Sequence, residues 1–240
     1  MDYIGILKKI IDNSKHLVFF GGAGVSTASS IPDFRSSDGI YSEKYGSIPI
    51  ETIISHSFFI EHPDIFFKVY KEKLCYKDAL PNACHIGLAH LETKGILKAV
   101  ITQNIDDLHQ KAGSKRVIEL HGSTYRNYCM KCHKFFPLEK IIEAKGIPYC
   151  DCGGMIKPDV VLYGEALDYA PIEEAIFEIK NADTLIIGGT SLSVYPAAAF
   201  IDYFHGNNLI IINKDVTIRD SDATIIIRDD ISLVFQKLGY

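Results

Sequence analysis

Residues 17–36, LVFFGGAGVSTASSIPDFRS, are the stretch that decides how this chain folds. The first four residues are apolar and predict a buried parallel strand. Glycines follow at once, and a glycine turn lets the backbone come close to a ligand because no Cβ intervenes. The hydroxyls of Ser26 and Thr27 come where we expect a helix to begin. A strand, a glycine turn and a helix N-terminus together predict an anion site suited to the pyrophosphate of a nucleotide.

The match to the common dinucleotide-binding fingerprint is incomplete. Gly22 and Gly24 fit its first half, but Thr27 takes the place of the third glycine. Residues 31–35, IPDFR, come next, and Pro32 opposes a long continuous helix there. A phenylalanine beside an arginine just after a phosphate loop suggests a lid that takes part in chemistry. An ordinary glycine turn followed by a polar loop is the plainer alternative.

Composition limits the class of protein. The 240 residues suit one large domain or two small ones, and a hydrophobic fraction of 47% allows a proper core. The apolar runs are shorter than the ~20 residues that a spanning helix needs. Residues 1–15 predict an amphipathic helix rather than a secretory signal, so we expect a cytoplasmic protein. A net charge of −5 gives nucleic-acid binding no general support.

Four of the six cysteines form two close pairs, Cys129-x-x-Cys132 and Cys150-x-Cys152. In a cytoplasmic protein such pairs indicate metal binding rather than disulfides. Four thiolates suit tetrahedral zinc with no open position, which predicts a structural ion rather than a catalytic one. The alternative is a set of free cysteines on a small module.

Further strands are predicted where short apolar runs end in polar or glycine residues. They are expected at residues 99–102, 117–120, 159–162, 184–187, 209–212 and 224–227. Helical patterns alternate with them, and the aromatic residues between 58 and 70 also have helical spacing. This order predicts an α/β fold with a doubly wound parallel sheet that holds a nucleotide along one rim.

Two groups at the expected strand ends are candidates for chemistry. Residues 103–106, QNID, follow one strand, although Asp106 could simply cap a helix. His121 ends the next strand and precedes Gly122. A histidine with a pKa near ~6.5 can act as a general base at physiological pH. A lone histidine is more often structural, but this position favours function.

With these motifs in order, the sequence closely resembles the sirtuin family of NAD-dependent protein-lysine deacylases over nearly its whole length. The resemblance rests on the four paired cysteines and on six stretches, namely residues 22–26, 31–35, 102–106, 121–122, 163–165 and 189–196. Three departures stand out. Ser30 replaces a usual glycine, Tyr163 replaces a usual phenylalanine, and the second cysteine pair is shortened.

The resemblance implies a large Rossmann-like domain and a small zinc-binding and helical domain. The large domain would comprise residues 1–36, 80–123 and 159–240. The small one would combine a helical insertion, residues 37–79, with the zinc module, residues 124–158. NAD, a co-substrate, would lie in the cleft between the domains, and acyl-lysine would enter from the opposite side.

The resemblance also implies the chemistry. The acyl oxygen of lysine would attack the ribose C1′ as nicotinamide leaves, and the acyl group would end on ADP-ribose. His121 would be the general base, Asn104 would assist catalysis, and Phe34 would shield the reactive centre. Cofactor contacts would come from Gly22, Ala23, Gly24, Ser26, Thr27, Phe34, Arg35, Gln103, Asn104, Ile105, Asp106, Gly189, Thr190, Ser191, Asn213, Lys214, Asp230 and Ile231.

The acyl-lysine protein or peptide would bind as an added strand. Its contacts would come from Val160, Val161, Tyr163, Gly164, Glu165, Ser193 and Val194. Relatives that prefer succinyl groups share a Tyr-x-x-Arg pair, and the nearest pattern here is Tyr70-x-x-Lys73. The aromatic insertion instead suggests an apolar channel, so we expect uncharged acyl groups to be preferred.

Two other functions compete with deacylation. A protein ADP-ribosyltransferase is the first, although members that specialise in this way tend to lose the catalytic histidine, which is present here. A non-enzymatic NAD-sensing or zinc-mediated interaction module is the second, and the polar residues at several strand ends argue against it. We expect neither nucleic acid nor a membrane as partner.

Overall fold

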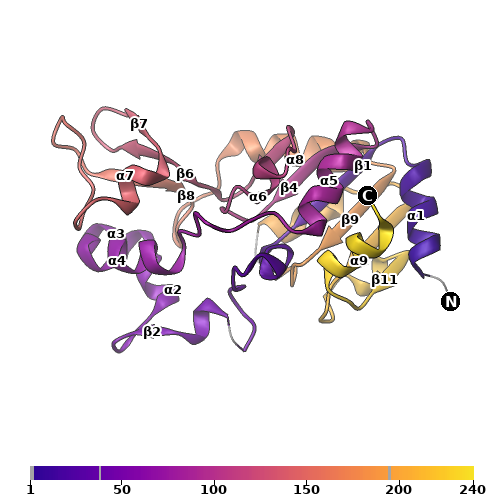
Figure 1. Cartoon of the computed structure of the whole chain (residues 1–240), viewed down its shortest axis with the longest axis horizontal. Coiled ribbons are helices and arrows are strands. Elements are labelled where there is room, and N and C mark those ends of the chain that lie inside the picture. Colours follow the sequence, from indigo (N-terminus) through magenta and orange to yellow (C-terminus); the bar gives the residue numbers. More distant parts are fainter. Residues whose placement is uncertain (1–2, 38, 194–195) are drawn as a thin grey trace.

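The computed structural model of the protein describes residues 3–37, 39–193 and 196–240. The molecule is elongated, with a part built around a large sheet on the right of Figure 1 and a smaller part of helices and short strands on the left. Within the described ranges, no helix is long and apolar enough to cross a membrane.

The described residues form one large sheet of six parallel strands in the order β11-β10-β9-β1-β4-β5. Strand β1 is central, and the chain builds outward from it first on one side and then on the other. This is the Rossmann strand order, with a crevice where the direction of winding reverses. The strands are β1 (Leu17–Gly21), β4 (Leu97–Thr102), β5 (Val117–Glu119), β9 (Thr184–Gly188), β10 (Asn208–Ile212) and β11 (Ile225–Ile227).

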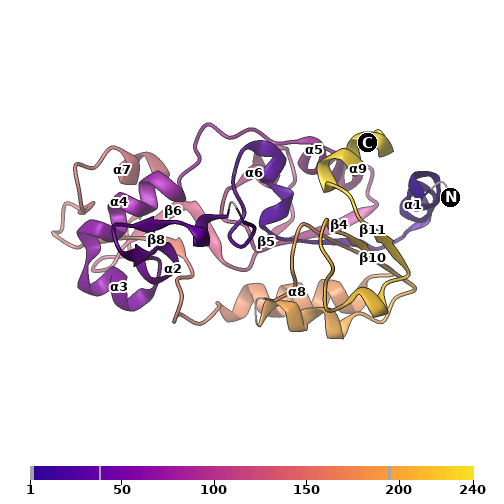
Figure 2. The ribbon, with the colours of Figure 1, turned by 90° about the horizontal axis from the view of Figure 1, so that it is seen from below.

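Helices cover both faces of this sheet. Along β1, Phe19 packs with apolar residues of α1 (Tyr3–Asn13), α5 (Ala83–Thr93) and α9 (Ile231–Leu238). Val18 and Phe20 point the other way, toward α8 (Tyr169–Asn181) and the 3₁₀ segment η4 (Ala197–Tyr203). Figure 2 shows α8 below the sheet, with α5 and α9 above it. Because both faces are covered, β1 is apolar at nearly every position.

The aromatic stretch before α5 forms a small helical unit. Its elements are η3 (Ile40–Ser42), β2 (Lys44–Tyr45), β3 (Ile48–Pro49), α2 (Ile50–Ile53), α3 (His56–Glu61) and α4 (Pro63–Lys73). Phe59, Phe66, Phe67 and Tyr70 are fully buried and stack or meet edge to face. The helical spacing of these aromatic residues therefore reflects a core, while the β2–β3 hairpin was not predicted.

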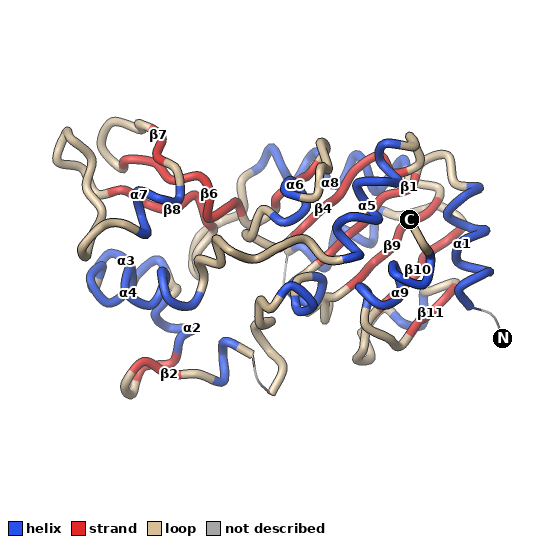
Figure 3. Tube along the Cα trace, viewed as in Figure 1, coloured by secondary structure: helices blue, strands red, loops and turns tan. Residues whose placement is uncertain are grey.

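A second, three-stranded antiparallel sheet lies beside these helices (Figure 3). It consists of β6 (Gly122–Cys129), β7 (Phe135–Phe136) and β8 (Ile156–Val160), with α7 (Leu138–Ile142) packed against β6. The expected strand at residues 159–162 is therefore wrong, because β8 ends at Val160 and pairs with β6 outside the parallel sheet. Apolar residues of this sheet and of the helical unit share one buried cluster.

The glycine loop after β1 does not lead into an α-helix. Two single 3₁₀ turns follow instead, η1 (Ala23–Val25) and η2 (Thr27–Ser29). Ser30 then takes a left-handed conformation with φ of 63°, and Pro32 follows closely. The helix expected to begin at Ser26 and Thr27 is thus wrong.

Two short elements complete the described structure, α6 (Leu108–Lys111) and η5 (Asp220–Asp222).

Candidate active site

A cavity of about 730 Å³ lies at the carboxyl ends of β1, β4 and β9 and is lined by residues from both parts of the molecule. It brings together most of the site residues expected from the sequence. They are Gly22, Ala23, Gly24, Thr27, Phe34, Arg35, Gln103, Asn104, Ile105, His121, Val160, Val161, Tyr163, Gly164, Glu165, Gly189, Thr190, Ser191, Asn213, Lys214, Asp230 and Ile231.

Four expected site residues do not line this cavity or are not described. Ser26 and Asp106 line a smaller adjoining cavity together with Asn104. Ser193 is exposed and hydrogen-bonds Ser191 through the two hydroxyls at 2.7 Å. Val194 lies outside the described residues.

Glycines let the loops after β1 and β9 pack backbone against backbone. The amide of Gly24 donates to the carbonyl of Gly189 at 2.8 Å. A Cβ on Gly24 would lie 2.8 Å from the Cα of Gly189, and one on Gly189 would lie 2.4 Å from the amide of Val25. A Cβ on Gly22 would approach Thr190 just as closely. These loops form a narrow backbone cradle at the crevice where a Rossmann sheet binds a dinucleotide.

Hydrogen bonds fix the polar side chains that follow β4. The amide of Asn104 donates to Ser26 Oγ at 3.0 Å, and Ser26 Oγ donates to Asp106 Oδ2 at 2.6 Å. Burial raises the pKa of Asp106, while the hydrogen bonds from Ser26 and Leu108 oppose that rise. Ser26 is buried and does not line the main cavity, so it positions Asn104 and Asp106 without facing the cavity itself. Gln103 donates to the hydroxyl of Thr190 and so ties the β4 loop to the β9 loop.

His121 lies where the chain passes from β5 to β6. Its Nδ1 is 2.9 Å from the carbonyl oxygen of Gln103. A carbonyl can only accept a hydrogen bond, so Nδ1 carries the proton and Nε2 is the basic nitrogen. Burial lowers the pKa of His121, and the bond to the Gln103 carbonyl partly offsets this effect. The imidazole is therefore neutral at physiological pH and able to accept a proton.

The far end of the cavity is polar and charged. Lys214 pairs with Asp230 at 2.8 Å, and Asp230 also caps α9 by accepting from the amide of Ser232. Asn213 donates to the backbone of Asp215 and is partly exposed. At the opposite end Arg35 is exposed, and its guanidinium lies 5.8 Å from the centroid of the Tyr41 ring.

The chain after β8 runs along the cavity and is held from both sides. The amide of Val161 donates to the carbonyl of His121 at 3.1 Å. Tyr163 exchanges backbone bonds with Ile54 and His56 of the helical unit. Glu165 accepts a hydrogen bond from the backbone amide of Leu162. Burial alone would raise the pKa of Glu165, but this bond and the interactions with His56 and Lys157 outweigh burial and lower it.

Sequence reasoning missed several cavity residues because they lie in the helical unit, in α8 or in the loop just before α8. They are Tyr41, Ile54, Leu74, Leu167 and Ile172, all apolar or aromatic. Their spacing reads as ordinary core, and only the fold brings them to the cavity. Lys73 does not line it and instead pairs with Glu43 at 2.6 Å. Tyr70 is buried in the aromatic core.

The four paired cysteines form a compact cluster where β6 of the second sheet ends. Their sulfur atoms all lie within 4.8 Å of one another, and the Cys129–Cys152 and Cys132–Cys150 pairs are 3.4 Å and 3.6 Å apart. Zn–S bonds of about 2.3 Å put the sulfurs of a tetrahedral site about 3.8 Å apart. The cluster is therefore compatible with a structural zinc. A Cβ on Gly154 would lie 2.6 Å from Cys129 Sγ, so glycine is needed at this turn.

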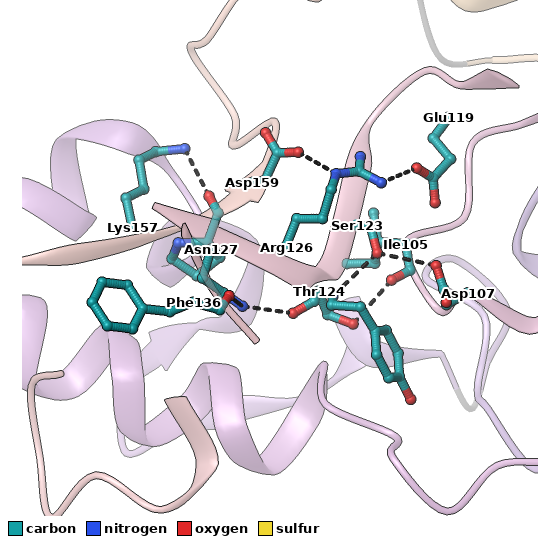
Figure 4. A network of polar contacts seen from close by, with 12 residues as sticks. Ile105, Asp107, Glu119, Ser123, Thr124, Arg126, Asn127, Phe136, Lys157 and Asp159 are labelled. Atoms are coloured by element: carbon teal, nitrogen blue, oxygen red, sulfur yellow. Dashed lines mark hydrogen bonds and ion pairs between the residues drawn. The ribbon is translucent and has the colours of Figure 1, made fainter. Parts of the chain in front are cut away.

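A polar network around β6 joins the two parts of the molecule (Figure 4). Arg126 of β6 bonds Glu119 at the end of β5 and Asp159 of β8. Thr124 donates through its backbone and its hydroxyl to the carbonyl of Ile105. The β5–β6 connection that carries His121 is thus fixed at both ends.

The chain is similar in sequence to a known protein family and to proteins of several bacteria. A model of the Sir2 family matches residues 22–196. An NAD-dependent protein deacetylase of Clostridium acetobutylicum is 56% identical over 99% of this chain and 98% of its own length. One from Clostridium perfringens is 57% identical, with the same coverage.

Solved structures agree in fold. A Sir2 protein with a p53 peptide and NAD⁺ is 38% identical, with a TM-score of 0.86 over 99% of this chain and 97% of that one. Another, with a deacetylated p53 peptide and 3′-O-acetyl ADP ribose, has a TM-score of 0.88 at 38% identity over 98% of this chain and 96% of that one.

Proposed function

The chain belongs to the Sir2 family, and from this premise we propose how its own residues carry out NAD-dependent deacetylation of protein lysines. The protein is an NAD-dependent protein deacetylase, in which the acetyl group of lysine passes to ADP-ribose and nicotinamide is released. The observation that carries the assignment of roles is the single cavity that joins the glycine cradle, Asn104 and His121.

The cradle of Gly22, Gly24 and Gly189 suits the pyrophosphate of NAD, because these glycines let the two loops close together, backbone against backbone, at the cavity. Thr190 and Ser191 add hydroxyls beside it, and Arg35 adds a positive charge. The nicotinamide end lies toward Asn104 and Asp106, which Ser26 holds in place. The adenosine end lies toward Asn213, Lys214, Asp230 and Ile231.

When bound, NAD supplies the ribose carbon that accepts the acetyl oxygen as nicotinamide departs. His121 then takes a proton from a ribose hydroxyl at Nε2, which its bond to Gln103 leaves unprotonated. Asn104 orients the ribose through the amide that Ser26 fixes. Phe34 covers the reacting centre and keeps water from it.

The acetyl-lysine peptide lies along residues 160–165 and reaches the cavity from the side of Tyr163 and Gly164. Backbone bonds from Ile54 and His56 hold this segment before any peptide arrives. Ser193 and Val194 complete the peptide site in this proposal.

The four-cysteine cluster holds one structural zinc per chain in this proposal. Residues 37–79 and 124–158 together form the small domain, which is supported by the buried cluster that their side chains share. The remaining residues form the Rossmann-like domain. The cytoplasmic location expected from the sequence also stays a proposal.

The test is to identify the products from purified protein, NAD and an acetyl-lysine peptide. Equal amounts of nicotinamide, deacetylated peptide and O-acetyl-ADP-ribose are expected. Protein labelled with ADP-ribose and no deacetylated peptide would instead show an ADP-ribosyltransferase, and binding of NAD without nicotinamide release would show a sensing module.

A further inference from the structure

Two tyrosine hydroxyls meet at the edge of the cavity and come from segments far apart in the sequence. Tyr41 lies in η3, and Tyr163 lies in the chain that follows β8. Their hydroxyls are hydrogen-bonded, their ring centroids are 6.1 Å apart, and both rings line the cavity.

The backbone fixes each of these tyrosines. The amide of Tyr41 donates to the carbonyl of Phe34 at 3.0 Å, which closes the loop between them. Tyr163 accepts from the amide of His56 at 2.9 Å and donates to the carbonyl of Ile54 at 3.2 Å. The hydroxyl pair therefore joins two anchored segments rather than two loosely held side chains.

Tyr41 keeps its proton at neutral pH. Burial raises the pKa of Tyr41, and the hydrogen bond with Tyr163 raises it further. A neutral hydroxyl can donate to its partner or accept from it, so the pair stays bonded over the working pH range.

Tyr41 in turn contacts the residues that face the reacting centre. The centroid of its ring lies 5.3 Å from that of Phe34, and the guanidinium of Arg35 lies over the Tyr41 ring, 5.8 Å from its centroid. A shift of Tyr41 would therefore displace Phe34 and Arg35, because the same short loop carries all three.

We propose that Tyr163 is a positioning residue whose hydroxyl holds Tyr41 so that Phe34 covers the reacting ribose carbon while the peptide is bound. This inference rests on the proposed roles of Phe34 and of residues 160–165. When the hydroxyl pair is broken, water reaches the ribose carbon. The water oxygen forms a bond to this ribose carbon as the bond between that carbon and nicotinamide breaks. NAD and water thus give ADP-ribose, nicotinamide and a proton.

The experiment compares Tyr163→Phe, Tyr41→Phe and the double variant with wild type in the presence of an acetyl-lysine peptide. Nicotinamide release and lysine deacetylation are measured together. The loss of a neutral hydrogen bond changes an equilibrium constant by roughly three- to tenfold. We therefore expect the nicotinamide release that is not matched by deacetylation to rise by that factor in each single variant. The double variant should show no further rise, because the second hydroxyl has already lost its partner.

Tyr169→Phe is the matched control, since Tyr169 is exposed on α8 and does not line the cavity. Its product ratio should equal that of wild type. Unchanged ratios in Tyr163→Phe, or strictly additive effects in the double variant, would overturn the inference.

A second measurement does not need activity. In the protein without ligands, the amides of Ile40 and Tyr41 donate to Asp33 and Phe34, so their hydrogen exchange reports how firmly the loop is held. Faster exchange in Tyr163→Phe supports the inference, and unchanged exchange contradicts it. A wild-type protein that deacetylates no peptide would overturn the proposed function, and exchange would still decide whether the hydroxyl pair holds the loop.

Discussion

At the scale of single residues, the proposed chemistry depends on a neutral His121. Its bond to the Gln103 carbonyl selects the tautomer, and burial lowers its pKa below the ordinary value. The sequence indicated this residue by its place at a strand end. It could not indicate the partner, because Gln103 and His121 come from different strand ends and meet only when β4 and β5 pair.

The lowered pKa of His121 predicts the pH dependence of deacetylation. The unprotonated form is the base, so kcat/KM should stay high as pH falls toward about 6.5, the ordinary pKa of histidine. It should then decline as pH passes through the lowered pKa. The measurement is a pH profile of kcat/KM for an acetyl-lysine peptide. A midpoint above that of free histidine would contradict the assignment.

Gly122, the next residue, is required by both its conformation and its surroundings. It has φ of +76°, and a Cβ there would lie 1.9 Å from the carbonyl oxygen of Asp159. Gly122→Ala should therefore lower the free energy of unfolding by more than the ~1–2 kcal/mol of backbone strain alone. Gly95→Ala is the control, because Gly95 has φ of +73° and open space around it. Equal losses of stability in thermal unfolding would show that the clash is relieved.

At the scale of elements, apolar periodicity predicted most helices and strands but not which strands pair with each other. The six parallel strands, α1 and the aromatic helices lie close to where the apolar patterns put them. Buried and half-buried positions alternate along residues 156–160, which is typical of an antiparallel sheet with one covered face. The short apolar run at residues 159–162 did not reveal this pattern, and β8 pairs with β6 rather than with the parallel sheet. The glycine loop failed to start a helix because Ser30 and Pro32 interrupt it.

The cysteine cluster predicts one tightly bound zinc per chain. Cys129→Ala should lose the metal and unfold the second sheet, because Cys129 is buried among the shared apolar side chains. Metal analysis and thermal unfolding of the purified variant are the measurements. Cys75→Ala is the control, since Cys75 lies outside the cluster and should leave the zinc content unchanged. A wild-type protein without zinc would refute the prediction.

At the scale of the whole molecule, the cavity exists only because two parts of the chain face each other. The Rossmann-like sheet supplies the glycine cradle, and the helical unit supplies Tyr41, Ile54 and Leu74. The network around Arg126 holds the parts together next to His121. The sequence indicated both parts through its motifs, but their shared apolar cavity wall emerges only from the packing of the whole chain.

This apolar wall predicts the acyl preference. A succinyl group carries a carboxylate that is costly to bury without a cation, and Lys73 is held by Glu43 outside the cavity. We expect kcat/KM for acetyl- and butyryl-lysine to exceed that for succinyl-lysine on one peptide by at least about tenfold, since leaving a buried charge unpaired costs more than 1.4 kcal/mol. Lys73→Ala should not change the ratio. A preference for succinyl that Lys73→Ala abolishes would identify Lys73 as the missing cation.

The most direct test of the account is to measure NAD binding and deacetylation together in His121→Ala. NAD affinity should stay close to that of wild type, because the glycine cradle and the adenosine end are intact. Deacetylation of an acetyl-lysine peptide should fall by ~10²–10⁴, the usual loss when a general base is removed. His205→Ala, an exposed histidine outside the cavity, should behave as wild type. Near-normal deacetylation by His121→Ala would contradict the account.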